Sequence, residues 1–172
     1  MTVPLEKVEI VDKNLNVLYV TSKDEAHKKG LLHKCTVAQL INSKGQFMLI
    51  KPYSTRQDAG QYVCPVGGHV SAGEKDDDAL KREVEEEIGL KRFGHKLKGK
   101  AIFDRHVIGR HENHYFIFYE IYSDEEPILG NEAETARWFT PEEIKKETKT
   151  HSKEFGDAYF FVLKNFYKEF LL

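Results

Sequence analysis

The chain has 172 residues, of which 40% are hydrophobic and 12% aromatic, and its formal net charge at pH 7 is -2. This length suits one domain with a sizeable core, and the composition argues against intrinsic disorder. Acidic and basic residues are interspersed, so no nucleic-acid footprint is visible, and no apolar run approaches the about 18 residues of a membrane helix.

The N-terminus lacks the apolar centre of a signal peptide. Cys35 and Cys64 are the two cysteines, and they do not suggest a disulfide framework. We therefore expect a cytoplasmic protein that has neither a nucleic acid nor a membrane as a partner.

The first 30 residues predict a small β-hairpin followed by a helical turn. Residues 8–11 and 17–21 are β-rich and flank the turn-forming Asp12-Lys13-Asn14. Residues 22–29 are polar and end at Gly30, which is typical of a short helix with a glycine at its end.

A second hairpin is expected from residues 33–42 and 46–51, which Ser43-Lys44-Gly45 joins. Residues 52–61 form a loop, and residues 62–66 predict a short strand that leads into the glycines Gly67 and Gly68.

Beyond residue 90 the pattern predicts more strands and two helices. Residues 96–107 and 115–122 are β-rich, and the aromatic run of the second indicates a strand buried on both faces. An acidic loop at 123–134 precedes a last short strand at 136–139.

Thr140 then caps a helix that has Pro141 at its first position. Residues 155–172 carry a broad apolar stripe, so a C-terminal helix should pack on the domain or on a second subunit of a homodimer.

Residues 68–90 concentrate carboxylates beside a glycine-rich turn. A helix should begin near residues 76–78 and end at Gly89. At about 100° per residue, Glu87 lies about 40° to one side of Glu83 and Glu86 about 60° to the other. Such close carboxylates repel unless a cation joins them, and oxygen ligands suit Mg²⁺ or Mn²⁺. A solvated acidic helix face is the alternative.

The same stretch resembles the signature of the Nudix family at nine defined positions, namely Gly68, Glu74, Arg82, Glu83, Val84, Glu86, Glu87, Gly89 and Leu90. The resemblance implies an α+β fold, an α/β/α sandwich with a mixed sheet. Residues 31–150 would be the common core of a single domain spanning 1–172, with the hairpin at 1–30 and the helix at 151–172 as additions.

The resemblance also implies a pyrophosphohydrolase that uses Mg²⁺ or Mn²⁺ to cleave a small-molecule diphosphate linked to a group X. Glu83, Glu86 and Glu87 would be metal ligands, and Arg82 would orient them through a salt bridge to Glu74. A carboxylate must accept the proton of the attacking water. Glu87, Glu132 and Glu134 are the three candidates.

A second group of donors, His27, His33, His69, Glu112 and His114, would suit Zn²⁺ or Mn²⁺. Independent histidines are the alternative. Their order resembles isopentenyl-diphosphate isomerases, which share the Nudix fold and bind a metal through three histidines and two glutamates. The first four residues match four of those ligands, and His114 stands where the isomerases carry Glu.

Two departures argue against isomerase activity. The isomerases need a cysteine just before the loop histidine, where this chain has Val66, Gly67 and Gly68. They also usually lack the complete glutamate signature. We therefore favour a hydrolase of the isomerase-like subgroup over an isomerase or a non-catalytic nucleotide-sensing module.

Group X stays open between nucleotides, nucleotide sugars and prenyl diphosphates. Tyr53, Tyr62 and Phe103 are candidates for stacking on a base. Four basic side chains are candidates for binding phosphate: Lys51, Arg56, Arg105 and Arg110.

Overall fold

The structure, a computed structural model, describes residues 3–172. In these residues one mixed sheet has eight strands: β1 (Lys7–Val11), β2 (Val17–Ser22), β3 (His33–Ile41), β4 (Phe47–Pro52), β5 (Val66–His69), β6 (Gly94–Val107), β7 (Arg110–Tyr122) and β8 (Ala133–Phe139). β3 lies at the centre and pairs with β7 in parallel from His33 to Ile41. Its other edge is shared in turn by β1, β5 and β4.

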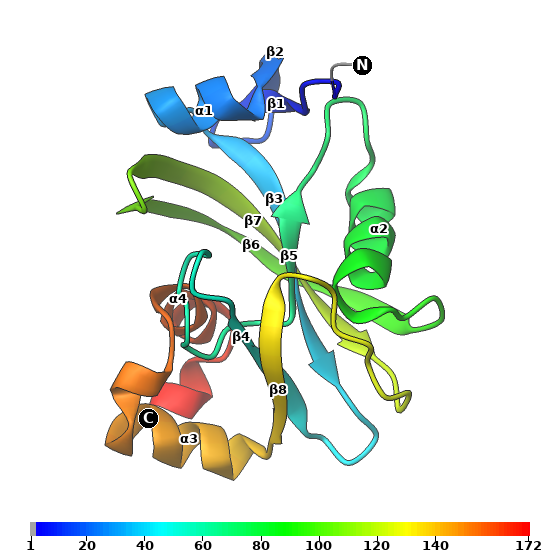
Figure 1. Cartoon of the computed structure of the whole chain (residues 1–172), viewed down its shortest axis with the longest axis vertical. Helices are drawn as coiled ribbons and strands as arrows, with labels where there is room; N and C mark the ends of the chain where they lie inside the picture. The colour runs from blue at the N-terminus through cyan, green and yellow to red at the C-terminus, as the bar shows by residue number, and fades with distance from the viewer. Residues whose placement is uncertain (1–2) are drawn as a thin grey trace.

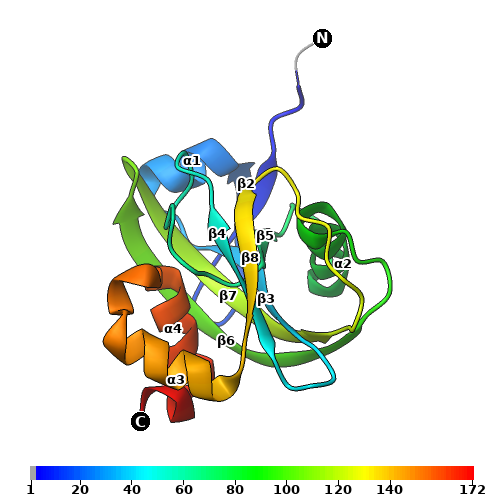
Figure 2. The same ribbon diagram turned by 60° about the horizontal axis from the view of Figure 1, so that its bottom comes forward.

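The helices lie on both faces of this sheet (Figures 1 and 2). They are α1 (Lys23–Lys29), α2 (Asp76–Ile88), α3 (Pro141–Thr150) and α4 (Asp157–Phe166), with short 3₁₀ turns η1 (Ser152–Glu154) and η2 (Lys168–Leu171). Alternate residues of β3 serve the two layers, because successive side chains of a strand point to opposite faces. Cys35 and Val37 pack with α4, whereas Ala38 and Leu40 pack with α2. The expected α/β/α sandwich with a mixed sheet is confirmed.

α2 forms as the sequence predicts. Leu80, Val84 and Ile88 are each 0% exposed and bury one face of the helix. Gly89 ends it in the left-handed conformation, with φ 67°. Lys75 occupies the N-cap and makes no side-chain capping bond, so the acids of the first turn favour the helix through its dipole rather than as caps.

Three boundaries differ from the prediction. The strand expected at 62–66 is instead β5, which contains the glycines themselves, because Gly67 and Gly68 pair with β3 in extended conformation. β7 begins at Arg110 and forms a long antiparallel pair with β6, and β8 begins at Ala133. The first residues of β7 and β8 include polar ones with low β-propensity, so a prediction based on β-propensity placed the starts of these strands too late.

The C-terminal stretch 155–172 is not one helix. α4 ends at Phe166, Tyr167 has φ -139°, and η2 follows. The break lets both Tyr167 and Phe170 join the core under β4, where each ring contacts Phe47. The apolar stripe thus packs on its own domain.

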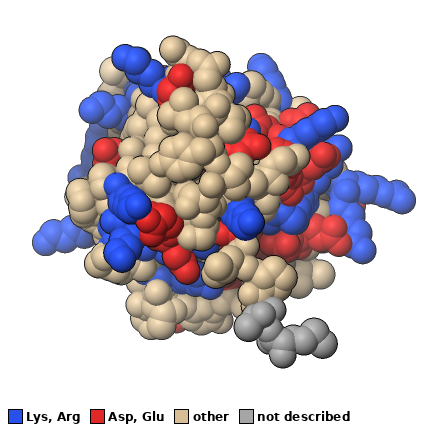
Figure 3. Space-filling model, turned by 90° about the horizontal axis from the view of Figure 1, so that it is seen from above, with Lys and Arg blue, Asp and Glu red and all other residues tan. Residues whose placement is uncertain are grey.

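The end of the molecule that carries α1 and the N-terminal hairpin has basic and acidic side chains around a largely uncharged centre (Figure 3). None of the helices in residues 3–172 is long and apolar enough to cross a membrane.

Candidate functional site

One cavity of about 590 Å³ collects most of the residues singled out above. Its wall includes Gly68 and His69 of β5, three glutamates of α2 together with a fourth just before β8, and the ends of β6 and β7. These four glutamates, called the acidic wall below, are Glu83, Glu86, Glu87 and Glu132. The sheet therefore brings together carboxylates that are up to 49 positions apart in the chain.

Arg82 contacts two glutamates of α2, Glu83 and Glu86, and holds them beside Glu74. Its Nε and Nη2 donate to the two carboxylate oxygens of Glu74 at 2.9 and 3.0 Å, and Nη1 donates to Glu83 Oε1 at 2.6 Å. Nη2 also donates to the carbonyl of His69 at 3.0 Å, and Nη1 lies 3.5 Å from Glu86. The planar guanidinium thus orients α2 relative to β5 and to Glu74. The predicted contact between Arg82 and Glu74 is present.

Two carboxyl groups of the acidic wall, those of Glu83 and Glu87, have raised pKa values. Burial raises the pKa of Glu83 to about 7, although Arg82 opposes the shift. Burial, and then the negative charges of Glu132 and Glu83, raise the pKa of Glu87 to about 8. Carboxylates held this way favour a bound cation, because a cation removes both the repulsion and the cost of burial.

The two candidate bases on the acidic loop, Glu132 and Glu134, differ in their position relative to the cavity. Glu132 lines the cavity next to Glu87 and forms an ion pair with Arg56, whose Nη2 lies 2.7 Å from Glu132 Oε1. Glu134 is exposed, and it lies outside the residues that line the cavity. The register between β4 and β8 shifts here, since Lys51 pairs with Thr135 while Pro52 pairs with Ala133, and Glu134 is the extra residue.

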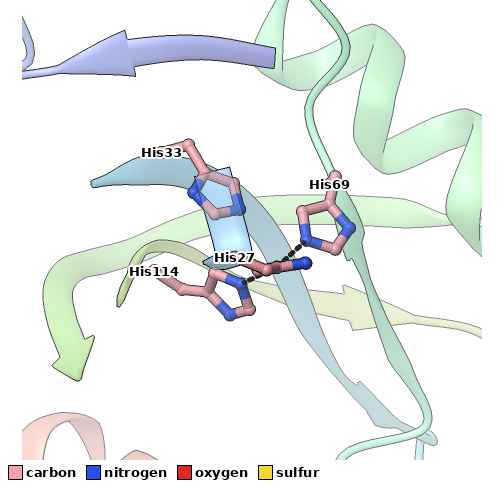
Figure 4. A group of neighbouring side chains, drawn as sticks. All are labelled: His27, His33, His69 and His114. Atoms are coloured by element: carbon pink, nitrogen blue, oxygen red, sulfur yellow. Dashed lines mark hydrogen bonds between the residues drawn. The ribbon is translucent and has the colours of Figure 1, made fainter. Parts of the chain in front are cut away.

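Four of the predicted donors meet in one cluster, His27 of α1, His33 of β3, His69 of β5 and His114 of β7 (Figure 4). One ring nitrogen from each lies within 4.8 Å of all the others. His27 Nε2 is 3.1 Å from His114 Nε2 and 3.2 Å from His69 Nε2. The strand register explains part of the meeting, because His33 pairs directly with His114 across β3 and β7, and His69 pairs with Cys35, two residues after His33.

The cluster is neutral and incompletely bonded. Burial lowers the pKa of His27 to about 4 and that of His114 to about 3, and it also lowers the pKa values of His33 and His69. His33 Nδ1 donates to the carbonyl of Leu31 at 2.7 Å, while its Nε2 is buried without a hydrogen-bond partner. Neutral imidazoles with a free buried nitrogen fit a transition metal such as Zn²⁺.

Glu112 stands apart from this cluster. Its carboxylate is 3% exposed and accepts from Gln57 at 2.6 Å, from Arg105 at 3.2 Å and from Arg110 at 2.6 and 3.0 Å. Burial would raise its pKa, but Arg110, His114 and Gln57 together hold the pKa below the usual value. Both oxygens are thus already occupied, and Glu112 is an anchor for basic side chains in this structure.

Sequence reasoning missed Gln57 and Asp58, which sit in the loop between β4 and β5. Asp58 pairs with Arg105 at 2.9 Å and has φ 54°, a conformation that Asp tolerates better than most residues. The only signal in the sequence is a polar loop, so their roles depend on where β6 and β7 place Arg105 and Glu112.

The proposed stacking residues lie elsewhere. Tyr62 packs edge-on against Phe139, Phe103 packs against Phe161, and Tyr53 is 45% exposed. None of them lines the cavity. Of the four basic candidates, Arg56, Arg105 and Arg110 line it, whereas Lys51 pairs with Glu154.

Comparisons with known proteins agree with this geometry. The chain is 35% identical over 85 residues to an uncharacterized Nudix hydrolase of Streptomyces coelicolor, and the match covers 49% of this chain and 47% of that protein. The chain thus spans about half the length of that relative. It is also 30% identical over 139 residues to isopentenyl-diphosphate Delta-isomerase 2 of Photorhabdus laumondii, covering 77% of this chain and 76% of that one.

Solved structures show the same fold. A crystal structure of a Deinococcus radiodurans protein has a TM-score of 0.76 and 18% identity, over 94% of this chain and 99% of the other. The MutT protein of Methanosarcina mazei has a TM-score of 0.63 and 25% identity, over 81% of this chain and 92% of the other. The family model described as the NUDIX domain matches residues 31–159. The chain belongs to the NUDIX family.

Proposed function

We propose that the chain is a hydrolase that uses Mg²⁺ or Mn²⁺ to cleave a small-molecule diphosphate linked to a group X. The observation that carries the proposal is the acidic wall, in which Glu83 and Glu87 have raised pKa values beside Glu132. Such a wall is costly without a cation, and oxygen donors of this kind suit hard divalent ions. The printed name of the Streptomyces relative, a Nudix hydrolase, supports the same activity.

Glu83, Glu86 and Glu87 would hold the cations, and Arg82 would keep Glu83 in place. When bound, the cations would neutralise the diphosphate and lower the pKa of a water. Glu87 and Glu132 are the two candidates for accepting the proton of the attacking water, because both face the cavity. Glu134, also a candidate by sequence, has less support because it is exposed and does not line the cavity.

We also propose that His27, His33, His69 and His114 hold a transition metal. Their four nitrogens favour Zn²⁺ over Mn²⁺, which prefers oxygen. Glu112 would support the site from outside rather than ligate the metal, since three side chains already occupy its oxygens.

The second candidate function is isomerisation of a prenyl diphosphate, which the Photorhabdus relative favours by its name. Gly67 offers no proton-transfer group at the position where the isomerases carry cysteine. Cys64 does line the cavity, but burial raises its pKa, so it is held as a thiol. A non-catalytic sensing module is the third candidate, and the complete glutamate signature argues against it.

The main experiment is a panel of diphosphates assayed with Mg²⁺ and Mn²⁺, in which released phosphate species and isomerised prenyl product are both measured. We expect hydrolysis that falls by orders of magnitude in Glu86→Gln and Glu87→Gln while thermal unfolding stays cooperative. Glu85→Gln is the matched control, because Glu85 lies on the same helix and its side chain is 56% exposed. Retained hydrolysis in both variants would contradict the assignment.

The histidine site needs a measurement that does not depend on activity. Metal analysis of the purified protein should find about one transition-metal ion per chain, and His69→Ala should lower that content. His151→Ala, at an exposed histidine, should leave it unchanged. Absence of bound metal in the parent protein, even after incubation with Zn²⁺, would remove the site.

A further inference from the structure

Neither the backbone conformation nor a close neighbour requires a glycine at position 67. The φ of Gly67 is not positive, and a Cβ atom built on it would meet nothing within 4 Å. Glycine inside a strand weakens the strand, and it often marks a place where a ligand approaches closely. The neighbouring Gly68 differs, because its Cβ would lie 2.1 Å from the Glu83 carboxyl carbon. Of these two neighbouring glycines, Gly67 is therefore the one beside which the protein leaves space unfilled.

This room lies over the apolar part of the cavity. Gly67 pairs with Val37 across β5 and β3, and Cys35 pairs with Phe116 across β3 and β7. All four residues line the cavity. Paired residues in a sheet point to the same face, so Gly67 adds no side chain beside Val37 on the face that lines the cavity.

Helix α4 closes the apolar part from the other side. Ala158 and Val162 both line the cavity, and Val162 belongs to the same apolar cluster as Val37 and Phe116. Two residues before Cys35 and Phe116 on the same two strands, His33 pairs with His114. One part of the cavity is thus lined by charged side chains and histidines, and another part is lined by aliphatic and sulfur-containing side chains.

The apolar part has little to recognise a nucleobase. Phe116 is the single Phe, Tyr or Trp among the described lining residues, and its ring already contacts Phe103 and Phe161 at centroid distances of 5.4 Å. The nearby polar side chains are also occupied, because Gln57 donates to Glu112 and Asp58 pairs with Arg105. A base would bury its polar edge here without partners, which is unfavourable.

We propose that Gly67 is a specificity residue and that the space beside it receives a group X that is uncharged and mainly aliphatic. The inference depends on the proposed hydrolase function for its catalytic test. The diphosphate would lie towards the acidic wall, and X would lie over Val37 against α4.

The test compares methyl, butyl and octyl diphosphate with ADP and a nucleotide sugar as substrates, in the presence of Mg²⁺. In the parent protein kcat/KM should rise from methyl to butyl diphosphate by about threefold to fourfold per buried methylene. Butyl diphosphate should also exceed ADP. A preference for ADP or the nucleotide sugar would overturn the proposal.

Two variants test the position of X. Gly67→Val and Ala158→Leu should raise the KM for butyl and octyl diphosphate at least tenfold and change that for methyl diphosphate less than twofold. Lys164→Leu, on the exposed part of the same helix, should change neither. A loss in Gly67→Val that is equal for all chain lengths would overturn the proposal, provided that the thermal midpoint and Mg²⁺ binding are unchanged.

A binding measurement separates this inference from the hydrolase proposal. If no diphosphate is cleaved, the hydrolase proposal fails, and calorimetry with non-hydrolysable alkyl methylenebisphosphonates becomes decisive. Affinity that increases with chain length in the parent protein, and no longer does so in Gly67→Val, would support the apolar subsite. Affinity that is independent of chain length would overturn it.

Discussion

A Cβ atom on Gly68 would lie 2.1 Å from the carboxyl carbon of Glu83 and 2.2 Å from its Oε1. The side chain of Glu83 therefore occupies the space that any other residue at position 68 would need. Because Arg82 holds the same carboxylate at 2.6 Å, Glu83 is fixed from two sides. The position of the Glu83 carboxylate in α2 therefore depends on a glycine at position 68 in β5.

Gly68→Ala should displace Glu83 and weaken Mg²⁺ binding about tenfold or more. The clash is with the end of a flexible side chain, so the stability cost should stay near the lower end of the about 1–3 kcal/mol typical of overpacking. Calorimetric titration with Mg²⁺ and thermal unfolding measure the two effects. Gly67→Ala is the control, since its Cβ meets nothing, and equal Mg²⁺ affinities in the two variants would contradict the prediction.

Glu87→Gln should stabilise the metal-free protein at alkaline pH. The pKa of Glu87 is about 8 in the folded state against a reference of 4.5, so the folded state binds the extra proton between these values. The free energy of unfolding of the parent therefore falls as pH rises through this window. Glu87→Gln lacks this loss and should be more stable by about 1–3 kcal/mol at pH 8, allowing for partial solvent screening.

Denaturant unfolding in the presence of a chelator, from pH 5 to pH 9, measures the difference. At pH 5 the two proteins should be similar in stability. Glu85→Gln should follow the parent throughout, and a constant difference between parent and Glu87→Gln would show that charge is not the cause.

The histidine cluster should make the metal-free protein sensitive to acid. The folded-state pKa values of His27 and His114 are about 4 and about 3, below the reference of 6.5. The unfolded chain thus binds more protons below pH 6.5, and stability is lost as pH falls through that value, by at most about 1.4 kcal/mol per pH unit for each histidine.

His114→Asn should reduce this slope, because a neutral amide replaces one titrating group. Unfolding free energies between pH 4.5 and pH 7 in a chelator measure it, and added Zn²⁺ should raise the stability of the parent more than that of the variant. An unchanged slope would argue that His114 is already protonated in the folded protein.

The loop between β4 and β5 offers a test of conformation against charge. Asp58 combines φ 54° with an ion pair to Arg105, and its side chain is 8% exposed. Asp58→Asn keeps a residue that tolerates this φ but removes the charge, whereas Asp58→Ala loses both. We expect Ala to cost about 1 kcal/mol more than Asn in the free energy of unfolding.

Asp58→Gly completes the comparison, because glycine adopts positive φ without strain. It should be no less stable than Asp58→Ala. The opposite order would mean that the backbone at this position is not strained.

The sequence by itself determined the acidic helix, its end at Gly89 and the family. Local rules are sufficient there: the apolar residues Leu80, Val84 and Ile88 recur at helical spacing, and the glutamate signature lies within one window. The order of the histidines along the chain also carried a resemblance that predicted a common site, and His27, His33, His69 and His114 do lie together, whereas Glu112 stands apart from them. The sequence left three candidate bases and several classes of X.

Only the tertiary structure decided how the distant segments meet. A one-residue shift between β4 and β8 places Glu132 in the cavity and Glu134 outside it, and no local pattern encodes such a shift. Glu112 contacts Arg105 because β6 and β7 pair in that register, and the loop between β4 and β5 brings Gln57 to the same carboxylate. Whether a glycine leaves free space, as Gly67 does, or makes room for a side chain, as Gly68 does, depends on neighbours that only the fold supplies.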